Sequence, residues 1–187
     1  MATVGYADAA RRGLQQMMAI DETILVRVRR SQVPRGAALA SAFTRAGDPA
    51  GWLIHAGLML ICLGPSGTRA AGVLAIGALC GVAASQAIKR LVKRSRPRKG
   101  IAGFEVVLDD PDQFSFPSGH TTVAFAVVVA LSAVSPTLAL AELPFAAAIA
   151  VSRVYLGAHY PLDVAAGIVA GTAAGSAAIV ACGALLG

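Results

Sequence analysis

Charged residues are scarce in this chain of 187 residues: they make up 14% of it, whereas a soluble domain carries about a quarter. Hydrophobic residues make up 56% of the chain, and its mean hydropathy is +0.68. The apolar residues are gathered in segments that approach the roughly 20 residues needed to cross a bilayer. The scarcity of charge therefore excludes an ordinary soluble domain and predicts a multi-pass membrane protein.

Cysteines and aromatic residues are also few. The three cysteines, Cys62, Cys80 and Cys182, each lie inside an apolar run without metal-ligand spacing, so we expect small buried hydrophobic side chains. The net charge of +6 could suggest nucleic acid, but the basic residues flank apolar segments instead of alternating with aromatic ones. We therefore predict no nucleic-acid partner, and favour the lipid bilayer and phosphorylated lipids.

The N-terminus lacks the apolar core of a cleavable signal peptide, because Asp8, Arg11 and Arg12 interrupt it. Residues 8–32 have a basic amphipathic pattern that predicts a helix in the membrane interface. Five predicted membrane spans follow, at 52–64, 70–91, 118–136, 138–156 and 161–186. The sequence thus predicts an all-α integral membrane protein with about five transmembrane helices plus an N-terminal interfacial amphipathic helix. Residues 1–187 form a single domain in this prediction, with 1–48 as the interfacial segment and 93–117 as a loop at the active site.

A basic cluster, KRLVKRSRP (89–97), follows the second predicted span. Lys89 and Arg96 are seven residues apart, so on a continuous helix both would face the same side. Pro97 disfavours a helical conformation at Arg96 and would end the helix there. The cluster could bind phosphate, although a topology signal or a lipid-headgroup contact would explain it as well.

The third predicted span begins with PSGH (117–120). Ser118 is a good N-cap residue and Gly119 lets the backbone approach a ligand, so the first amides of the helix form an anion site. His120 is then within reach of a bound anion. The alternative is a capped helix with an interfacial histidine.

The stretch SRVYLGAHYPLDV (152–164) joins the last two predicted spans. Pro161 suits the first turn of a helix, which places His159 just before that helix and Asp163 in its first turn. An aspartate four residues after a histidine can accept the imidazole N–H and leave the other ring nitrogen to attack. Arg153 adds a guanidinium group whose geometry matches phosphate. Glycines recur four residues apart in the last span (167, 171 and 175), a spacing that predicts close helix packing.

The predicted topology puts all three stretches on one face of the membrane. We therefore predict one pocket that combines cations, a helix-end anion site and two histidines, a set suited to phosphoryl transfer. The pocket residues are Lys89, Arg96, Ser118, Gly119, His120, Arg153, His159 and Asp163.

In this order, the motifs Lys-x6-Arg-Pro (89–97), Pro-Ser-Gly-His (117–120) and Ser-Arg-x5-His-x3-Asp (152–163) resemble those of the type-2 phosphatidic acid phosphatase family. The resemblance implies the acid-phosphatase-like helical core that this family shares with vanadium haloperoxidases. It also implies a lipid phosphatase without metal or cofactor. His159 would be the nucleophile that forms a phosphohistidine, Asp163 would orient it, and His120 would protonate the leaving oxygen. The residues implied to hold the phosphoryl oxygens are Lys89, Arg96, Ser118, Gly119 and Arg153.

The substrate stays open among phosphatidic acid, phosphatidylglycerol phosphate, polyprenyl diphosphate and polyprenyl-linked sugar phosphates. Two other functions are a vanadate-dependent haloperoxidase and a non-catalytic binder of lipid phosphates. The loop carboxylates Asp109, Asp110 and Asp112 have no histidine partner in the sequence, so we expect them to solvate the loop or to offset the arginines instead of binding Mg²⁺.

The distribution of positive charge predicts which side of the membrane carries the pocket. Of the 16 lysines and arginines, only Arg69 falls on the opposite side, and the positive-inside rule then predicts a cytoplasmic face. The small size favours a bacterial plasma-membrane enzyme of phospholipid or cell-envelope metabolism. Many bacterial members of the resembled family face outward, so both orientations stay open.

Overall fold

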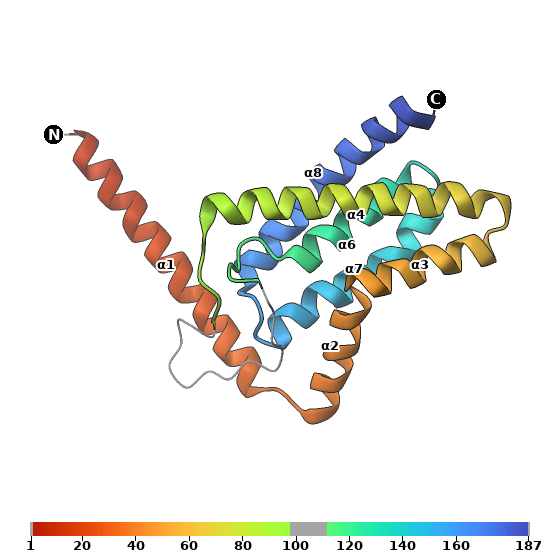
Figure 1. Ribbon diagram of the computed structural model, residues 1–187. Helices are drawn as coiled ribbons and strands as arrows, with labels where there is room; N and C mark the ends of the chain where they lie inside the picture. The colour runs from red at the N-terminus through yellow and green to blue at the C-terminus, as the bar shows by residue number, and fades with distance from the viewer. Residues whose placement is uncertain (1, 98–111, 187) are drawn as a thin grey trace.

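The computed structural model describes residues 2–97 and 112–186, and every regular element among them is a helix (Figure 1). This confirms the predicted all-α fold. The helices are α1 (Ala2–Arg30), α2 (Pro34–Ala46), α3 (Pro49–Cys62), α4 (Pro65–Val92), α6 (Gly119–Ser132), α7 (Pro136–Tyr155) and α8 (Pro161–Leu186).

Prolines mark where most of these helices begin. Residues Pro34, Pro49, Pro65, Pro136 and Pro161 are the first residues of their helices. Proline suits this position because the first N–H groups of a helix have no partner within it, and because its ring presets a helical φ. Hydropathy alone places the starts of α3 and α4 at residues 52 and 70, so the prolines locate them better.

The short helix α6 lies at the centre of the bundle and packs against α4, α7 and α8. Its residues Ala124, Val127 and Leu131 are completely buried. Helix α8 approaches it so closely that a Cβ atom on Gly175 would lie 2.6 Å from the carbonyl oxygen of Ala126. The predicted role of the glycine spacing in helix packing is therefore confirmed. A Cβ atom on Gly167 would lie 3.0 Å from the carbonyl oxygen of Ser118, so the N-terminal end of α6 lies beside that of α8.

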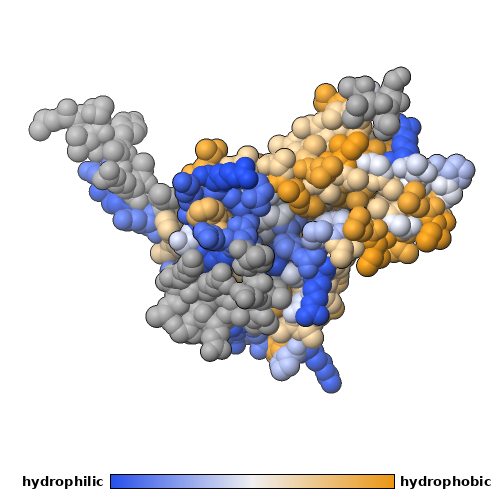
Figure 2. Space-filling view, in the orientation of Figure 1, coloured by the Kyte–Doolittle hydropathy of each residue, from blue (hydrophilic) through white to orange (hydrophobic). Residues whose placement is uncertain are grey.

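Among the helices that the structure describes, three of the five apolar ones are long and apolar enough to cross a membrane: α4, α7 and the Pro161–Gly183 part of α8. Helices α3 and α6 have 14 residues each, so α6 is shorter than the predicted span 118–136, while α3 is about as long as the predicted span 52–64 but begins and ends earlier. At 1.5 Å per residue, 14 residues span about 21 Å, less than the roughly 30 Å of a bilayer core. Figure 2 shows apolar side chains over the surface formed by α3, α4 and α8, and hydrophilic ones toward α1.

The N-terminal segment contains two helices where the sequence predicted one. Helix α1 confirms a helix over 8–32 and ends at Arg30, while α2 was not predicted. Helix α1 exposes Met17 and Met18 but buries Asp21 and Leu25, so one side of it packs against the bundle. Its place in the membrane interface and the single-domain organisation stay predictions.

The cysteines only partly match their predicted burial. Cys182 is buried and Cys80 is half-buried, but Cys62 is exposed at the end of α3. The apolar run around Cys62 therefore did not indicate a packed position.

Candidate active site

The basic cluster spans the end of α4 and the chain that follows it. Helix α4 ends at Val92, because Lys93 adopts a left-handed conformation with φ of 51° and donates its N–H to the carbonyl of Lys89. The prediction that the helix continues to Arg96 is therefore wrong. Lys89 and Arg96 are nevertheless both buried and line one cleft.

A short backbone contact joins the two ends of the loop that begins there. Ser95 and Phe114 form an antiparallel bridge, and the N–H of Ser115 donates to the carbonyl of Arg94 at 2.8 Å. This contact brings the basic cluster next to the start of α6. The predicted loop carboxylates Asp109 and Asp110 lie outside the described residues.

Asp112 lies among the cations of the basic cluster. Its carboxylate accepts a hydrogen bond from Lys89, and its backbone carbonyl accepts one from Nε of Arg96 at 2.7 Å. Burial alone would raise the pKa of Asp112, but Lys89, the backbone N–H of Phe114 and the charge of Arg96 hold it below its usual value. Asp112 therefore carries a negative charge within the cation cluster, as expected of a carboxylate that offsets basic residues.

The N-terminal end of α6 faces these cations. Ser118 is the N-cap residue, as predicted, but its side chain makes no capping hydrogen bond and instead accepts one from the Thr121 hydroxyl at 3.0 Å. The N–H of Ser118 donates to the backbone carbonyl of Asp163 at 2.9 Å, which ties α6 to α8. A Cβ atom on Gly119 would lie 3.6 Å from Nζ of Lys89, so the backbone of the first helical turn is close to a cation.

His120 pairs with a carboxylate that the sequence did not point to. Its Nε2 atom lies 2.7 Å from Oδ1 of Asp48. Asp48 occupies the N-cap position of α3, yet it makes no side-chain capping bond there, because its carboxylate turns toward α6. A carboxylate at this distance favours the charged imidazolium form, which can donate a proton.

The turn between α7 and α8 places His159. Gly157 has a φ of +74°, a conformation that suits glycine, and it lets the chain reverse directly after α7. The N–H groups of Ala158 and His159 both donate to the carbonyl of Arg153, at 3.0 and 3.2 Å. Nη1 of Arg96 donates to the carbonyl of Ala158 at 3.2 Å, so this turn also contacts the basic cluster.

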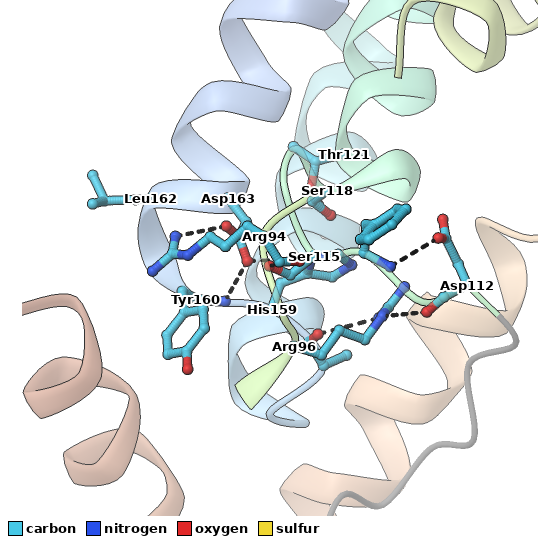
Figure 3. A network of polar contacts seen from close by, with 12 residues as sticks. Arg94, Arg96, Asp112, Ser115, Ser118, Thr121, His159, Tyr160, Leu162 and Asp163 are labelled. Atoms are coloured by element: carbon cyan, nitrogen blue, oxygen red, sulfur yellow. Dashed lines mark hydrogen bonds and ion pairs between the residues drawn. The ribbon is translucent and has the colours of Figure 1, made fainter. Parts of the chain in front are cut away.

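The predicted pair of His159 and Asp163 is present and buried. Nδ1 of His159 lies 3.5 Å from Oδ2 of Asp163, and the exposed fractions of the two side chains are 1% and 0%. Oδ2 of Asp163 also accepts a hydrogen bond from the N–H of Tyr160 at 3.0 Å. Oδ1 accepts one from Nη1 of Arg94 at 2.7 Å (Figure 3). The carboxylate is therefore held between the histidine and an arginine.

A cleft of about 660 Å³ leads from this group of polar residues along α3 and α4. Five predicted residues line its polar end: Lys89, Arg96, Gly119, His120 and His159. Ser118, Arg153 and Asp163 are buried and do not line it. The rest of the lining is mainly apolar and includes Trp52, Leu53, Leu74, Ala78, Leu79, Val82 and Val123.

Three residues of this site were not predicted from the sequence: Asp48, Arg94 and Asp21. The Asp-Pro pair at 48–49 signals a helix start, but nothing in the sequence links it to His120, 72 positions away. Arg94 is one of seven basic residues within the 11 positions 89–99, so its role could not be distinguished. Within the described residues, no three His, Cys, Asp or Glu side chains form a group that could hold a metal ion.

Sequence comparison connects this site to known proteins. Residues 68–184 match the profile of the PAP2 superfamily. The chain is 37% identical over 157 residues to decaprenylphosphoryl-5-phosphoribose phosphatase from Mycobacterium tuberculosis, which covers 82% of this chain and 85% of the relative. It is also 30% identical over 126 residues to an undecaprenyl-diphosphatase from Sulfolobus acidocaldarius, covering 65% of this chain and 58% of the relative.

Two solved structures share the fold. LpxE from Aquifex aeolicus superimposes with a TM-score of 0.71 at 20% identity and covers 84% of this chain and 93% of its own. A transmembrane PAP2-type phosphatidylglycerolphosphate phosphatase from Bacillus subtilis gives a TM-score of 0.65 at 22% identity, covering 87% of this chain and 84% of its own.

Proposed function

Because the chain belongs to the PAP2 superfamily, a family of phosphatases, we propose that it is an integral membrane lipid phosphatase that acts through a phosphohistidine on His159. It hydrolyses a phosphomonoester or diphosphate of a membrane lipid and requires no metal. The substrate class we favour is a polyprenyl-linked sugar phosphate.

The observation that carries this proposal is the composition of the cleft. At one end, Lys89, Arg96 and His159 offer cations and a nucleophile to an anion, while the walls along α3 and α4 are apolar. A lipid phosphate has the matching shape, with a charged group joined to a long hydrocarbon chain. The phosphate therefore binds among the cations, and the chain lies against residues such as Trp52 and Leu79.

The reaction proceeds in two steps. Because Nδ1 of His159 faces Asp163, Nε2 attacks the phosphorus while the bond to the lipid oxygen breaks and His120 protonates that oxygen. His120, now neutral, then removes a proton from water, and the water oxygen displaces His159 to release inorganic phosphate. Lys89, Arg96, Arg153 and the amides that follow Ser118 stabilise the charge on the phosphoryl oxygens in both steps.

The substrate class rests on the relatives and on the cleft. The Mycobacterium tuberculosis relative is a phosphatase of a polyprenyl-linked sugar phosphate, and the similarity covers most of both chains. The cleft walls are apolar over about two turns of α4, from Leu74 to Val82, which suits an extended prenyl chain. Phosphatidic acid, phosphatidylglycerol phosphate and polyprenyl diphosphate are the competing substrates.

A phosphate-release screen in detergent with EDTA present tests the proposed function. We expect the purified protein to hydrolyse a polyprenyl-linked sugar phosphate fastest among the four lipid classes, and vanadate to inhibit it. The cations of the cleft provide the charge that a metal would otherwise supply, so EDTA should not lower the rate. Inactivity on all four lipids, or activity that appears only after Mg²⁺ is added, would contradict the proposal.

A matched pair of substitutions on α4 extends the same screen to the cleft. Ala78 lines the cleft, whereas Ala83 is exposed and does not line it. We expect Ala78→Phe to raise KM for lipid substrates about tenfold, since the ring occupies space for the chain, while p-nitrophenyl phosphate turns over normally. Ala83→Phe should leave both substrates unaffected. Equal effects of the two substitutions would show that the chain binds elsewhere.

The charge distribution supports a cytoplasmic face for the site in a bacterial plasma membrane. The linker between α1 and α2 lies at the site end, because the N–H of Val33 donates to the hydroxyl of Tyr155 at 3.1 Å. Arg69 lies in the first turns of α4, at the other end of that helix from Lys89. By the positive-inside rule, the end rich in arginine and lysine stays in the cytoplasm.

Cysteine labelling in intact cells tests this orientation. After replacement of the three native cysteines, we expect an impermeant maleimide to label Ser66→Cys but not Ser31→Cys, because Ser66 starts α4 and Ser31 precedes α2 at the site end. Both positions are exposed, and both should react once the cells are permeabilised. Labelling of Ser31→Cys alone in intact cells would place the site on the outer face.

A further inference from the structure

Arg94 holds together two carboxylates from opposite ends of the chain. Its Nη1 donates to Oδ1 of Asp163, and its Nη2 donates to Oδ2 of Asp21 in α1, both at 2.7 Å. Its guanidinium carbon also lies 4.2 Å from the centre of the Tyr160 ring. The backbone carbonyl of Arg94 accepts a hydrogen bond from the N–H of Ser115, which fixes the position of the residue.

Asp21 is built into this arrangement and is not a surface residue. Its side chain is 1% exposed, and its second oxygen, Oδ1, accepts a hydrogen bond from the N–H of Leu162 at 2.8 Å. Leu162 is next to Asp163 in the first turn of α8, so Asp21 contacts that turn directly as well as through Arg94. Asp21 lies outside residues 68–184, the part of the chain that matches the family profile.

The charges in this arrangement explain why two carboxylates are present. Arg94 alone would neutralise Asp163 and weaken the support that this carboxylate gives to a positive His159. Asp21 neutralises Arg94, so that Asp163 keeps a net negative charge for the histidine. Burial alone would lower the pKa of Arg94, but Asp163 and Asp21 outweigh it and hold the pKa above the usual value. Arg94 therefore stays charged.

We infer that Arg94 and Asp21 are positioning residues that orient Asp163 and set its effective charge toward His159, and that α1 thereby forms part of the catalytic machinery. This inference rests on the proposed function, with His159 as the nucleophile. Among the described residues, the charged and titratable groups of the cleft beside His159 and of the Arg94 arrangement are Asp21 from α1, Lys89 from α4, Arg94, Arg96 and Asp112 from the loop ends, His120 from α6, Arg153 from α7, and Tyr160 and Asp163 at the start of α8. Glu22 from α1 acts on Tyr160.

The dependence of kcat/KM on pH separates this role from a purely structural one, because its acid limb reports protonation of the nucleophile. Asp21→Asn removes a negative charge and disfavours the imidazolium, so the acid limb should move to lower pH. Arg94→Gln removes a positive charge and should move the limb to higher pH, by about one unit. Ionisation of the substrate also affects the pH profile of kcat/KM, but it does so equally in all variants measured with the same lipid.

The double variant Asp21→Asn/Arg94→Gln completes a double-mutant cycle, which measures the coupling between Asp21 and Arg94. Arg94→Gln leaves two buried carboxylates together, and we expect it to lose about 100-fold in kcat/KM. The double variant restores the charge balance and should recover about tenfold of that loss, with its acid limb near that of the wild type. Asp21→Asn alone keeps the shape of the side chain and tests the inference even if Arg94→Gln does not fold.

Two results would overturn the inference while leaving the proposed function intact. One result is that the wild type is active and the losses of kcat/KM in the two single variants simply add in the double variant. The other is that the acid limb of the pH profile of kcat/KM has the same position in Asp21→Asn as in the wild type. A wild type that releases no phosphate from any lipid would instead overturn the proposed function, and this inference with it.

Discussion

His159→Ala should abolish phosphate release from every substrate, with a loss of at least about 10⁴-fold in kcat. The reason is that the proposed covalent intermediate forms on His159, so the two-step route is lost whatever the leaving group. His159 is buried, and its N–H donates to the carbonyl of Arg153 in the turn before α8. The measurement is phosphate release from a lipid substrate and from p-nitrophenyl phosphate.

Trapping of the intermediate provides the direct control. The wild type is quenched during turnover of a substrate whose phosphate is labelled, and the protein should then carry the label. The bond that holds this label should be stable in base and labile in acid, as expected of a phosphohistidine. His159→Ala should carry none, although it should still bind vanadate because the cations remain. Label that persists in His159→Ala would show that another residue is the nucleophile.

His120→Ala should cause a loss that depends on the leaving group. A general acid contributes roughly 10²–10⁴-fold where the leaving oxygen needs a proton. The alkoxide that leaves phosphatidic acid needs one most, a polyprenyl phosphate leaving a diphosphate needs it less, and a nitrophenolate hardly at all. We therefore expect the largest loss on phosphatidic acid and the smallest on p-nitrophenyl phosphate, measured as kcat on each.

Asp48→Asn is the matched variant for this prediction. Its carboxylate lies 2.7 Å from Nε2 of His120 and favours the imidazolium form of that side chain. Its replacement should lower activity on the three substrates in the same rank order as His120→Ala, with smaller losses. Equal losses on all three substrates in His120→Ala would instead indicate that His120 positions the phosphate and does not donate a proton.

The parts of the site that have local causes were predictable from the sequence. The turn at 156–160 followed from the sequence because its causes are local: a glycine after α7, a proline at the start of α8, and an aspartate four residues beyond His159. Hydropathy placed the end of the second span at residue 91, next to the end of α4 at Val92, but Pro97 predicted a helix that continues to Arg96. Pro97 restricts only the residue before it, whereas the helix stops earlier, at the left-handed Lys93.

By itself, the sequence determined the membrane class, the apolar helices and the order of the three motifs, because hydropathy and motif spacing depend on neighbours along the chain. The tertiary structure alone decided which carboxylates meet the functional side chains. Asp48 reaches His120 across 72 positions, and Asp21 reaches Arg94 across 73. Both pairings depend on how α1 and α3 pack against the ends of α4, α6 and α8. Helix packing is set by the shapes of whole surfaces, such as the glycine face of α8 against α6, and no local pattern encodes which distant charges those surfaces bring together.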